Sequence, residues 1–183
     1  MRVISGSARG KRLKELKGME TRPTTDKVKE SLFNIIQFDI PGRKVLDLFG
    51  GTGQLGLEAL SRGARHCTFV EQRRDAVALI RENLKFCGLA ENAHVVQGDA
   101  ISFLSSCREK FDVIFLDPPY QSDLLARSLE LIQKFDILSE NGIIVGETAL
   151  ELPFPTVEAP FEMGKEYRYG KIKLVVCHRA GER

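Results

Sequence analysis

Runs of mostly apolar residues constrain the fold of this chain more than any other feature. Five such runs occur along the sequence: KVLDLF (44–49), CTFVE (67–71), AHVVQ (93–97), FDVIFL (111–116) and IIVGE (143–147). Segments with the apolar spacing of amphipathic helices, such as residues 123–134, lie between them. Strands that are apolar throughout are buried on both faces, which is typical of parallel sheets covered by helices. The pattern predicts an α/β fold with a Rossmann-like, mostly parallel sheet and helices on both faces.

The last part of the chain departs from this alternation. Residues 161–178 contain two strand-like pieces around Tyr169-Gly170, with no helix between them. This arrangement predicts a hairpin that adds an antiparallel strand to the sheet. We also expect Asn141-Gly142 to form a turn before the fifth strand. With 183 residues and no linker or repeat, the chain is predicted to form one domain (21–183) preceded by a basic N-terminal arm (1–20).

Charge is unevenly distributed along the sequence. Residues 1–30 contain nine Lys or Arg and four acidic residues, a net charge of +5, whereas the whole chain has only +2. Basic charge at one end indicates a polyanionic partner or, as an equal alternative, a solvated arm. The chain has no apolar run of about 18 residues and no apolar signal segment, so we expect a cytoplasmic protein. The scattered cysteines and histidines indicate no metal site and reduced, packed thiols.

A glycine-rich loop follows the first apolar run. Gly51-x-Gly53-x-x-Gly56 has the spacing of a dinucleotide-binding loop, directly after a strand and before a helix. Glu71 ends the second run 20 residues after Gly51, where a carboxylate can accept hydrogen bonds from ribose hydroxyls. The pattern predicts a nucleotide-like ligand; a tight strand–helix turn without a ligand is the alternative.

Two further aspartates narrow the choice of ligand. Asp47, near the end of the first run, would repel a pyrophosphate but suits an ammonium group such as that of S-adenosylmethionine. Asp99 follows the third run, where it can accept from an adenine amine while the Ala100 N–H meets a ring nitrogen. Each has a structural alternative: Asp47 can cap local backbone N–H groups, and Asp99 can cap the helix that follows.

The fourth run ends in Asp117-Pro118-Pro119-Tyr120. Two prolines cannot continue a strand, because each lacks the N–H that a sheet requires. A turn that merely stops the strand is one interpretation. The other is a rigid clamp for a planar amine: the Asp117 carboxylate and the Pro118 carbonyl each accept one amine hydrogen, and Tyr120 stacks on the ring.

In this order, the motifs resemble a class I S-adenosylmethionine-dependent methyltransferase that acts on amino groups. The segments RVISGSARGKRL, RPTTDKVKESLFN, DLFGGTGQLGLEALSRGA and DPPY together resemble the bacterial small-subunit (16S) ribosomal RNA guanine-N2 methyltransferase family. The resemblance implies a seven-stranded sheet with the last strand antiparallel and S-adenosylmethionine as cofactor. It also implies a guanine amine of 16S rRNA as substrate, within the small subunit or an assembly intermediate. We expect a monomer.

The resemblance also assigns roles to residues of this sequence. Asp47, Gly51 and Gly53 would line the methionine end of the cofactor, Glu71 would hold the ribose, and Asp99 the adenine. An N-terminal motif beside the cofactor carboxylate would consist of Arg22, Thr24 and Thr25. Phosphates of the rRNA would be bound by Arg9, Lys11, Arg12 and Lys14.

Three other functions fit parts of the pattern. A DNA adenine-N6 methyltransferase would use the same clamp, but the chain has no inserted segment for DNA readout and no obvious helix to enter a major groove. An NAD-dependent oxidoreductase would explain the glycine spacing and Glu71, but would leave Pro118-Pro119-Tyr120 without a role. A non-catalytic RNA-binding module would explain only the basic arm.

Overall fold

In the computed structural model, residues 1–16 and 26–181 are described. The helices of this part are α1 (Asp26–Ile35), α2 (Gln54–Ser61), α3 (Arg74–Cys87), α4 (Ala100–Ser106) and α5 (Leu124–Lys134), with a short 3₁₀ helix η1 (Ala90–Asn92). The strands are β1 (Lys44–Asp47), β2 (His66–Glu71), β3 (Ala93–Gln97), β4 (Phe111–Leu116), β5 (Leu138–Ala149), β6 (Phe161–Tyr169) and β7 (Ile172–Arg179). Among the described helices, none is both long enough and apolar enough to cross a membrane.

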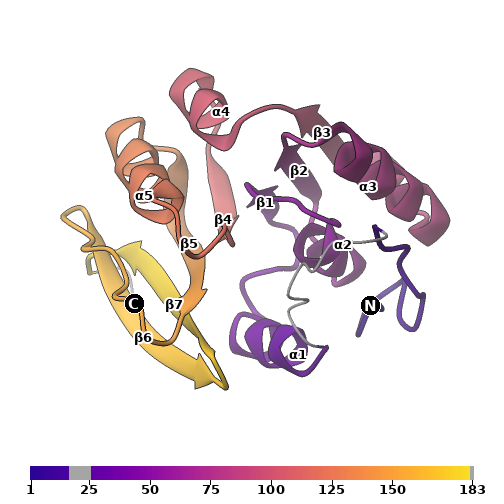
Figure 1. The fold of residues 1–183 in the computed structure, drawn as a ribbon, viewed down its shortest axis with the longest axis horizontal. Helices are drawn as coiled ribbons and strands as arrows, with labels where there is room; N and C mark the ends of the chain where they lie inside the picture. Colours follow the sequence, from indigo (N-terminus) through magenta and orange to yellow (C-terminus); the bar gives the residue numbers. More distant parts are fainter. Residues whose placement is uncertain (17–25, 182–183) are drawn as a thin grey trace.

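The strands form one seven-stranded sheet in the order β3-β2-β1-β4-β5-β7-β6 (Figure 1). Strands β1 to β5 pair with one another in parallel, and β7 runs antiparallel to both β5 and β6. The predicted seven-stranded, mostly parallel sheet with an antiparallel last strand is therefore confirmed. The order reverses between β1 and β4, and crevices for ligands form at such a point, outside the carboxyl ends of the strands.

Two hydrophobic clusters lie on opposite faces of the sheet. Successive strand residues alternate between them: Val45 and Val113 belong to the cluster beneath α1, α2 and α3, whereas Leu46 and Ile114 belong to the cluster beneath α4 and α5. Figure 1 shows α4 and α5 apart from the other three helices. Both faces exclude water, which explains why the central strands are apolar at nearly every position.

Strand β5 begins earlier in the chain than predicted. It begins at Leu138, and the expected turn at Asn141-Gly142 lies inside the strand as an irregularity, with Asn141 at a φ of 56°. The pairing moves from Phe111↔Leu138 to Val113↔Ile143, so β5 contains extra residues at this point. An Asn-Gly pair accommodates positive φ equally well in a turn and in a bulge, so its presence did not indicate where the strand begins.

The N-terminal segment 1–16 packs against the domain. An antiparallel bridge joins Arg2 to Arg12, which gives the segment a hairpin-like path. The carboxylate of Glu58, which is fully buried, accepts the backbone N–H groups of Ile4 at 2.8 Å and Ser5 at 3.0 Å, and the Lys29 ammonium donates to the Arg2 carbonyl at 2.5 Å. Buried polar groups therefore fix the course of this segment. The predicted boundary at residue 20 lies outside the described residues.

Candidate active site

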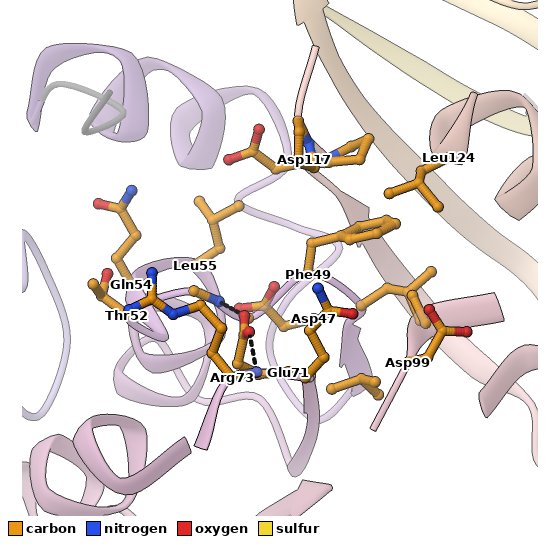
Figure 2. Close-up of a pocket in the computed structure, with 18 of the residues that line it drawn as sticks. Asp47, Phe49, Thr52, Gln54, Leu55, Glu71, Arg73, Asp99, Asp117 and Leu124 are labelled. Atoms are coloured by element: carbon orange, nitrogen blue, oxygen red, sulfur yellow. Dashed lines mark hydrogen bonds between the residues drawn. The ribbon is translucent and has the colours of Figure 1, made fainter. Parts of the chain in front are cut away.

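A cavity of about 500 Å³ opens at the carboxyl ends of the central strands. Four acidic side chains line it, each at or just after the end of a different strand: Asp47, Glu71, Asp99 and Asp117 (Figure 2). The strands are parallel and adjacent in the sheet, so the residues that follow them meet at one edge. The structure thus brings together four carboxylates that are far apart in the sequence.

The glycine loop between β1 and α2 forms one wall of the cavity. Gly51 lines the cavity with a φ of 54°, a conformation that residues with a side chain rarely adopt. Gly53 precedes α2 with a φ of 80° and does not line the cavity. Gly56 is needed for packing, because a Cβ atom there would lie 2.2 Å from the Phe69 ring. Of the two glycines predicted to contact a ligand, only Gly51 therefore faces this space.

Asp47 both accepts a backbone N–H group and lines the cavity. Its Oδ2 accepts the backbone N–H of Gly56 at 3.0 Å, and the residue also lines the cavity with only 2% of its surface exposed. Burial raises the pKa of Asp47 to about 7, an increase to which the charge of Glu71 adds and which the Gly56 hydrogen bond opposes. A bound cation would stabilise the ionised form.

Glu71 and Asp99 are held by backbone N–H groups. The Glu71 carboxylate accepts from Gly51 at 2.9 Å and from Arg73 at 2.8 Å, which ties the end of β2 to the glycine loop (Figure 2). Asp99 Oδ1 accepts from the Ser102 N–H at 2.8 Å and caps α4. Asp99 and Ala100 also line the cavity, so capping and a role toward a ligand are compatible.

Asp117 lies across the cavity from Glu71, at the end of β4 (Figure 2). Burial raises the pKa of Asp117 well above its ordinary value, and the nearby charges of Glu147 and Asp47 raise it further. The Tyr120 hydroxyl donates a hydrogen bond to Glu147 Oε1. Glu147 was missed in the sequence, although it ends the run IIVGE as Glu71 ends CTFVE.

A second cavity of about 430 Å³ adjoins the first. Pro118, Pro119 and Tyr120 line both cavities, so the Asp-Pro-Pro-Tyr turn separates them. The second cavity also reaches Glu147 and Thr148 at the end of β5. The arrangement offers two adjacent binding spaces that meet at the turn.

The remaining predicted residues belong to the N-terminal part of the chain. Arg22, Thr24 and Thr25 fall outside the described residues. The four basic residues of the N-terminal segment line neither described cavity: Arg9, Lys11, Arg12 and Lys14. Arg9, Arg12 and Lys14 are exposed. Lys11 Nζ donates to the Phe86 carbonyl at 2.9 Å and Lys14 Nζ to Glu82 at 2.9 Å. Cavity residues that the sequence did not single out include Thr52, Gln54, Leu55, Phe49 and Leu124.

The sheet order, with the acid-lined cavity at the carboxyl ends of its strands, is that of a class I, Rossmann-like methyltransferase. A solved structure of yhhF from Escherichia coli, described as a candidate methyltransferase, has the same fold with a TM-score of 0.90 and 34% identity, covering 98% of this chain and 97% of that one. The chain belongs to the family whose model is described as Conserved hypothetical protein 95, which matches residues 1–178.

Curated relatives match over nearly their full length. YlbH of Bacillus subtilis, described as a candidate rRNA methyltransferase, is 42% identical over 99% of this chain and 100% of that protein. Ribosomal RNA small subunit methyltransferase D of Escherichia coli is 36% identical over 100% of this chain and 91% of that protein. The family resemblance predicted from the four sequence segments is thus confirmed.

Proposed function

We propose that this protein transfers the methyl group of S-adenosylmethionine to the exocyclic N2 amine of a guanine in small-subunit (16S) rRNA, acting as a monomer. The observation that carries the proposal is the Asp117-Pro118-Pro119-Tyr120 turn between two adjoining cavities. The names of the relatives, which include a small-subunit rRNA methyltransferase, support an rRNA substrate. The target lies in the small subunit or in one of its assembly intermediates.

The donor set of the larger cavity fits S-adenosylmethionine better than NAD. Among the described residues, four carboxylates line the cavity, and the one arginine there, Arg73, is paired with Asp75 through a 2.5 Å contact. Such a site attracts an ammonium and a sulfonium, whereas a pyrophosphate would meet negative charge. Its volume of about 500 Å³ also suits a ligand of this size.

We propose a partner for each part of the cofactor. Asp47 and Gly51 would hold the methionine end, Glu71 would accept from the ribose hydroxyls, and Asp99 with the Ala100 N–H would hold the adenine. Gly53 would contribute by shaping the turn. Arg22, Thr24 and Thr25, outside the described residues, are proposed to meet the carboxylate.

The clamp acts on an amine whose lone pair is delocalised into the base. S-adenosylmethionine supplies an electrophilic methyl group. Asp117 and the Pro118 carbonyl each accept one amine hydrogen, which draws the nitrogen out of the ring plane and aims its lone pair. The two prolines hold these acceptors rigidly, so little order is lost in the transition state. As the N–C bond forms and the S–C bond breaks, Asp117 takes the proton that the amine releases.

Tyr120 contributes a surface on which the target base stacks. A base that enters such a pocket must leave its own stack, at a cost of a few kcal/mol, and stacking on an aromatic ring recovers part of this. The second cavity, lined by Tyr120 and Glu147, is the proposed place for the base.

The reaction is tested with labelled S-adenosylmethionine and three acceptors: unmethylated small subunits, deproteinised 16S rRNA and duplex DNA. We expect N2-methylguanosine in rRNA after nucleoside analysis and no methyladenine in DNA. Comparison of the two RNA acceptors identifies the form that is the substrate. Methyladenine in DNA with unmodified rRNA would instead favour the DNA adenine-N6 methyltransferase, and RNA binding without any transfer would favour a non-catalytic module.

The N-terminal segment is proposed to bind rRNA phosphates through its exposed cations. Lys11 and Lys14 already contact the domain, so Arg9 and Arg12 are the clearest candidates. Replacement of both by Gln should weaken RNA binding and lower the slope of log K against log salt by at most about 2, one unit per lost phosphate contact. Filter binding at several salt concentrations measures this slope.

A matched control removes two exposed cations from the β6–β7 hairpin, Lys165 and Lys171. Their replacement by Gln should leave the slope closer to that of the wild type. Equal slopes for both double variants would show that the N-terminal segment has no specific contact with RNA. Cofactor affinity should stay unchanged in each, because none of these side chains lines the cavity.

A further inference from the structure

Glu147 is a buried carboxylate beside the amine clamp that the mechanism above does not use. It lies near the end of β5 with 6% of its surface exposed and lines the second cavity. Strands β4 and β5 pair in parallel with Leu116 opposite Gly146, so the next residues along each chain, Asp117 and Glu147, are neighbours. Burying a carboxylate costs free energy, so the position of Glu147 next to Asp117 requires an explanation.

One explanation for the buried Glu147 is its contact with Tyr120. The two prolines fix the backbone ahead of Tyr120 but leave the rotation of its ring undetermined. The hydrogen bond from the Tyr120 hydroxyl to Glu147 Oε1 fixes the far end of the ring. Because Tyr120 lines both cavities, the orientation of this ring sets the shape of the space for the base.

The second reason is electrostatic. Burial raises the pKa of Asp117, and the charge of Glu147 contributes next, ahead of that of Asp47. Among the described residues, the charged groups that act on Asp117 are Asp47 from β1 and Glu147 from β5, both acidic. Tyr120 belongs to the same turn as Asp117. A general base works best when its pKa lies near the working pH, and a neighbouring negative charge moves a carboxyl group in that direction.

We propose that Glu147 is a positioning residue of the methyl-transfer site: it orients the Tyr120 ring for base stacking and places a second carboxylate beside that of Asp117. This inference rests on the proposed amine methylation and deepens it. Glu147 acts through its two neighbours, and it makes no bond to the transferred methyl group.

The decisive variant is Glu147→Gln, which keeps the size of the side chain and an oxygen for the Tyr120 hydroxyl but removes the charge. We expect the acid limb of the kcat–pH profile to move to lower pH, because loss of a neighbouring negative charge lowers a carboxyl pKa. The KM for RNA should stay near the wild-type value. Glu151→Gln removes an exposed charge just after β5 and should leave the profile unchanged.

A second variant separates the two roles. Tyr120→Phe removes the hydroxyl but keeps the ring and the Glu147 charge, so it should raise the KM for RNA without moving the acid limb. Identical profiles and identical KM values for Glu147→Gln, Tyr120→Phe and the wild type would overturn the proposal.

Carbon-13 NMR titration of the Asp117 carboxyl group gives a readout that does not depend on the methyl acceptor. Its midpoint should fall in Glu147→Gln and stay in place in Glu151→Gln, with Asp117→Asn used to assign the signal. An unchanged midpoint in an active enzyme would refute the electrostatic role of Glu147. A wild-type protein that methylates no nucleic acid would refute the proposed function instead, whatever the titration shows.

Discussion

Asp117→Ala should reduce the rate of methyl transfer at least about 100-fold, while S-adenosylmethionine binding stays near the wild-type level. The expected loss corresponds to the contribution of a positioned proton acceptor, about 10²- to 10⁴-fold. Asp117 lines the larger cavity opposite Glu71 and begins the turn whose Pro118, Pro119 and Tyr120 also line the second cavity (Figure 2). We therefore expect its substitution to affect the substrate more than the cofactor. Single-turnover kinetics and calorimetric titration with the cofactor measure the two effects separately.

Two further variants test whether Asp117 acts as the proton acceptor. Asp117→Asn keeps an oxygen that can accept one amine hydrogen but cannot take up the proton, so its rate should fall between those of Asp117→Ala and the wild type. Asp123→Asn removes an exposed carboxylate from the same loop and should have little effect. If Asp117→Ala lost cofactor binding and turnover to the same extent, Asp117 would be a structural residue.

The fold could be predicted because most of its determinants are local in sequence. Burial on both faces requires apolar residues at nearly every strand position, and this is visible in FDVIFL and CTFVE. The positions of four cavity carboxylates could also be predicted, because Asp47, Glu71, Asp99 and Asp117 each lie at or just after a strand end. The same rule applied to IIVGE would have found Glu147.

Other features depend on contacts between distant parts of the chain and leave no local pattern. Glu58 and Lys29 look like polar positions of amphipathic helices, yet both are fully buried, 3.7 Å apart, and anchor the N-terminal segment. The different roles of Gly51, Gly53 and Gly56 are likewise invisible in their spacing. One lines a cavity, one shapes a turn and one allows α2 to approach Phe69.

Asp47→Asn should make the unliganded protein more stable and bind S-adenosylmethionine less well. Burial raises the folded-state pKa of Asp47 to about 7, from an ordinary value of 3.8. The stability that follows from a raised carboxyl pKa is complete below 3.8 and is lost as the pH rises through about 7, because the buried group must then ionise. Asparagine carries no charge, and its amide oxygen can still accept the Gly56 N–H. The cost of ionising a buried carboxylate should therefore disappear in this variant.

The two effects should have related pH dependences, which makes the prediction specific. The melting temperature of Asp47→Asn should equal that of the wild type near pH 4, rise above it between about pH 4 and 7, and stay a few degrees higher at alkaline pH. Its affinity for S-adenosylmethionine should be about 10- to 100-fold weaker at about pH 8, the cost of losing an ionised partner for the ammonium. As the pH falls below about 7 the wild-type carboxyl becomes protonated as well, so the two affinities should converge toward acid pH. Scanning calorimetry and cofactor titration across this range measure both curves, with Asp123→Asn as the control.

Unchanged affinity at about pH 8 would show that Asp47 does not meet the ammonium, and a lower melting temperature there would show that Gly56 requires the carboxylate.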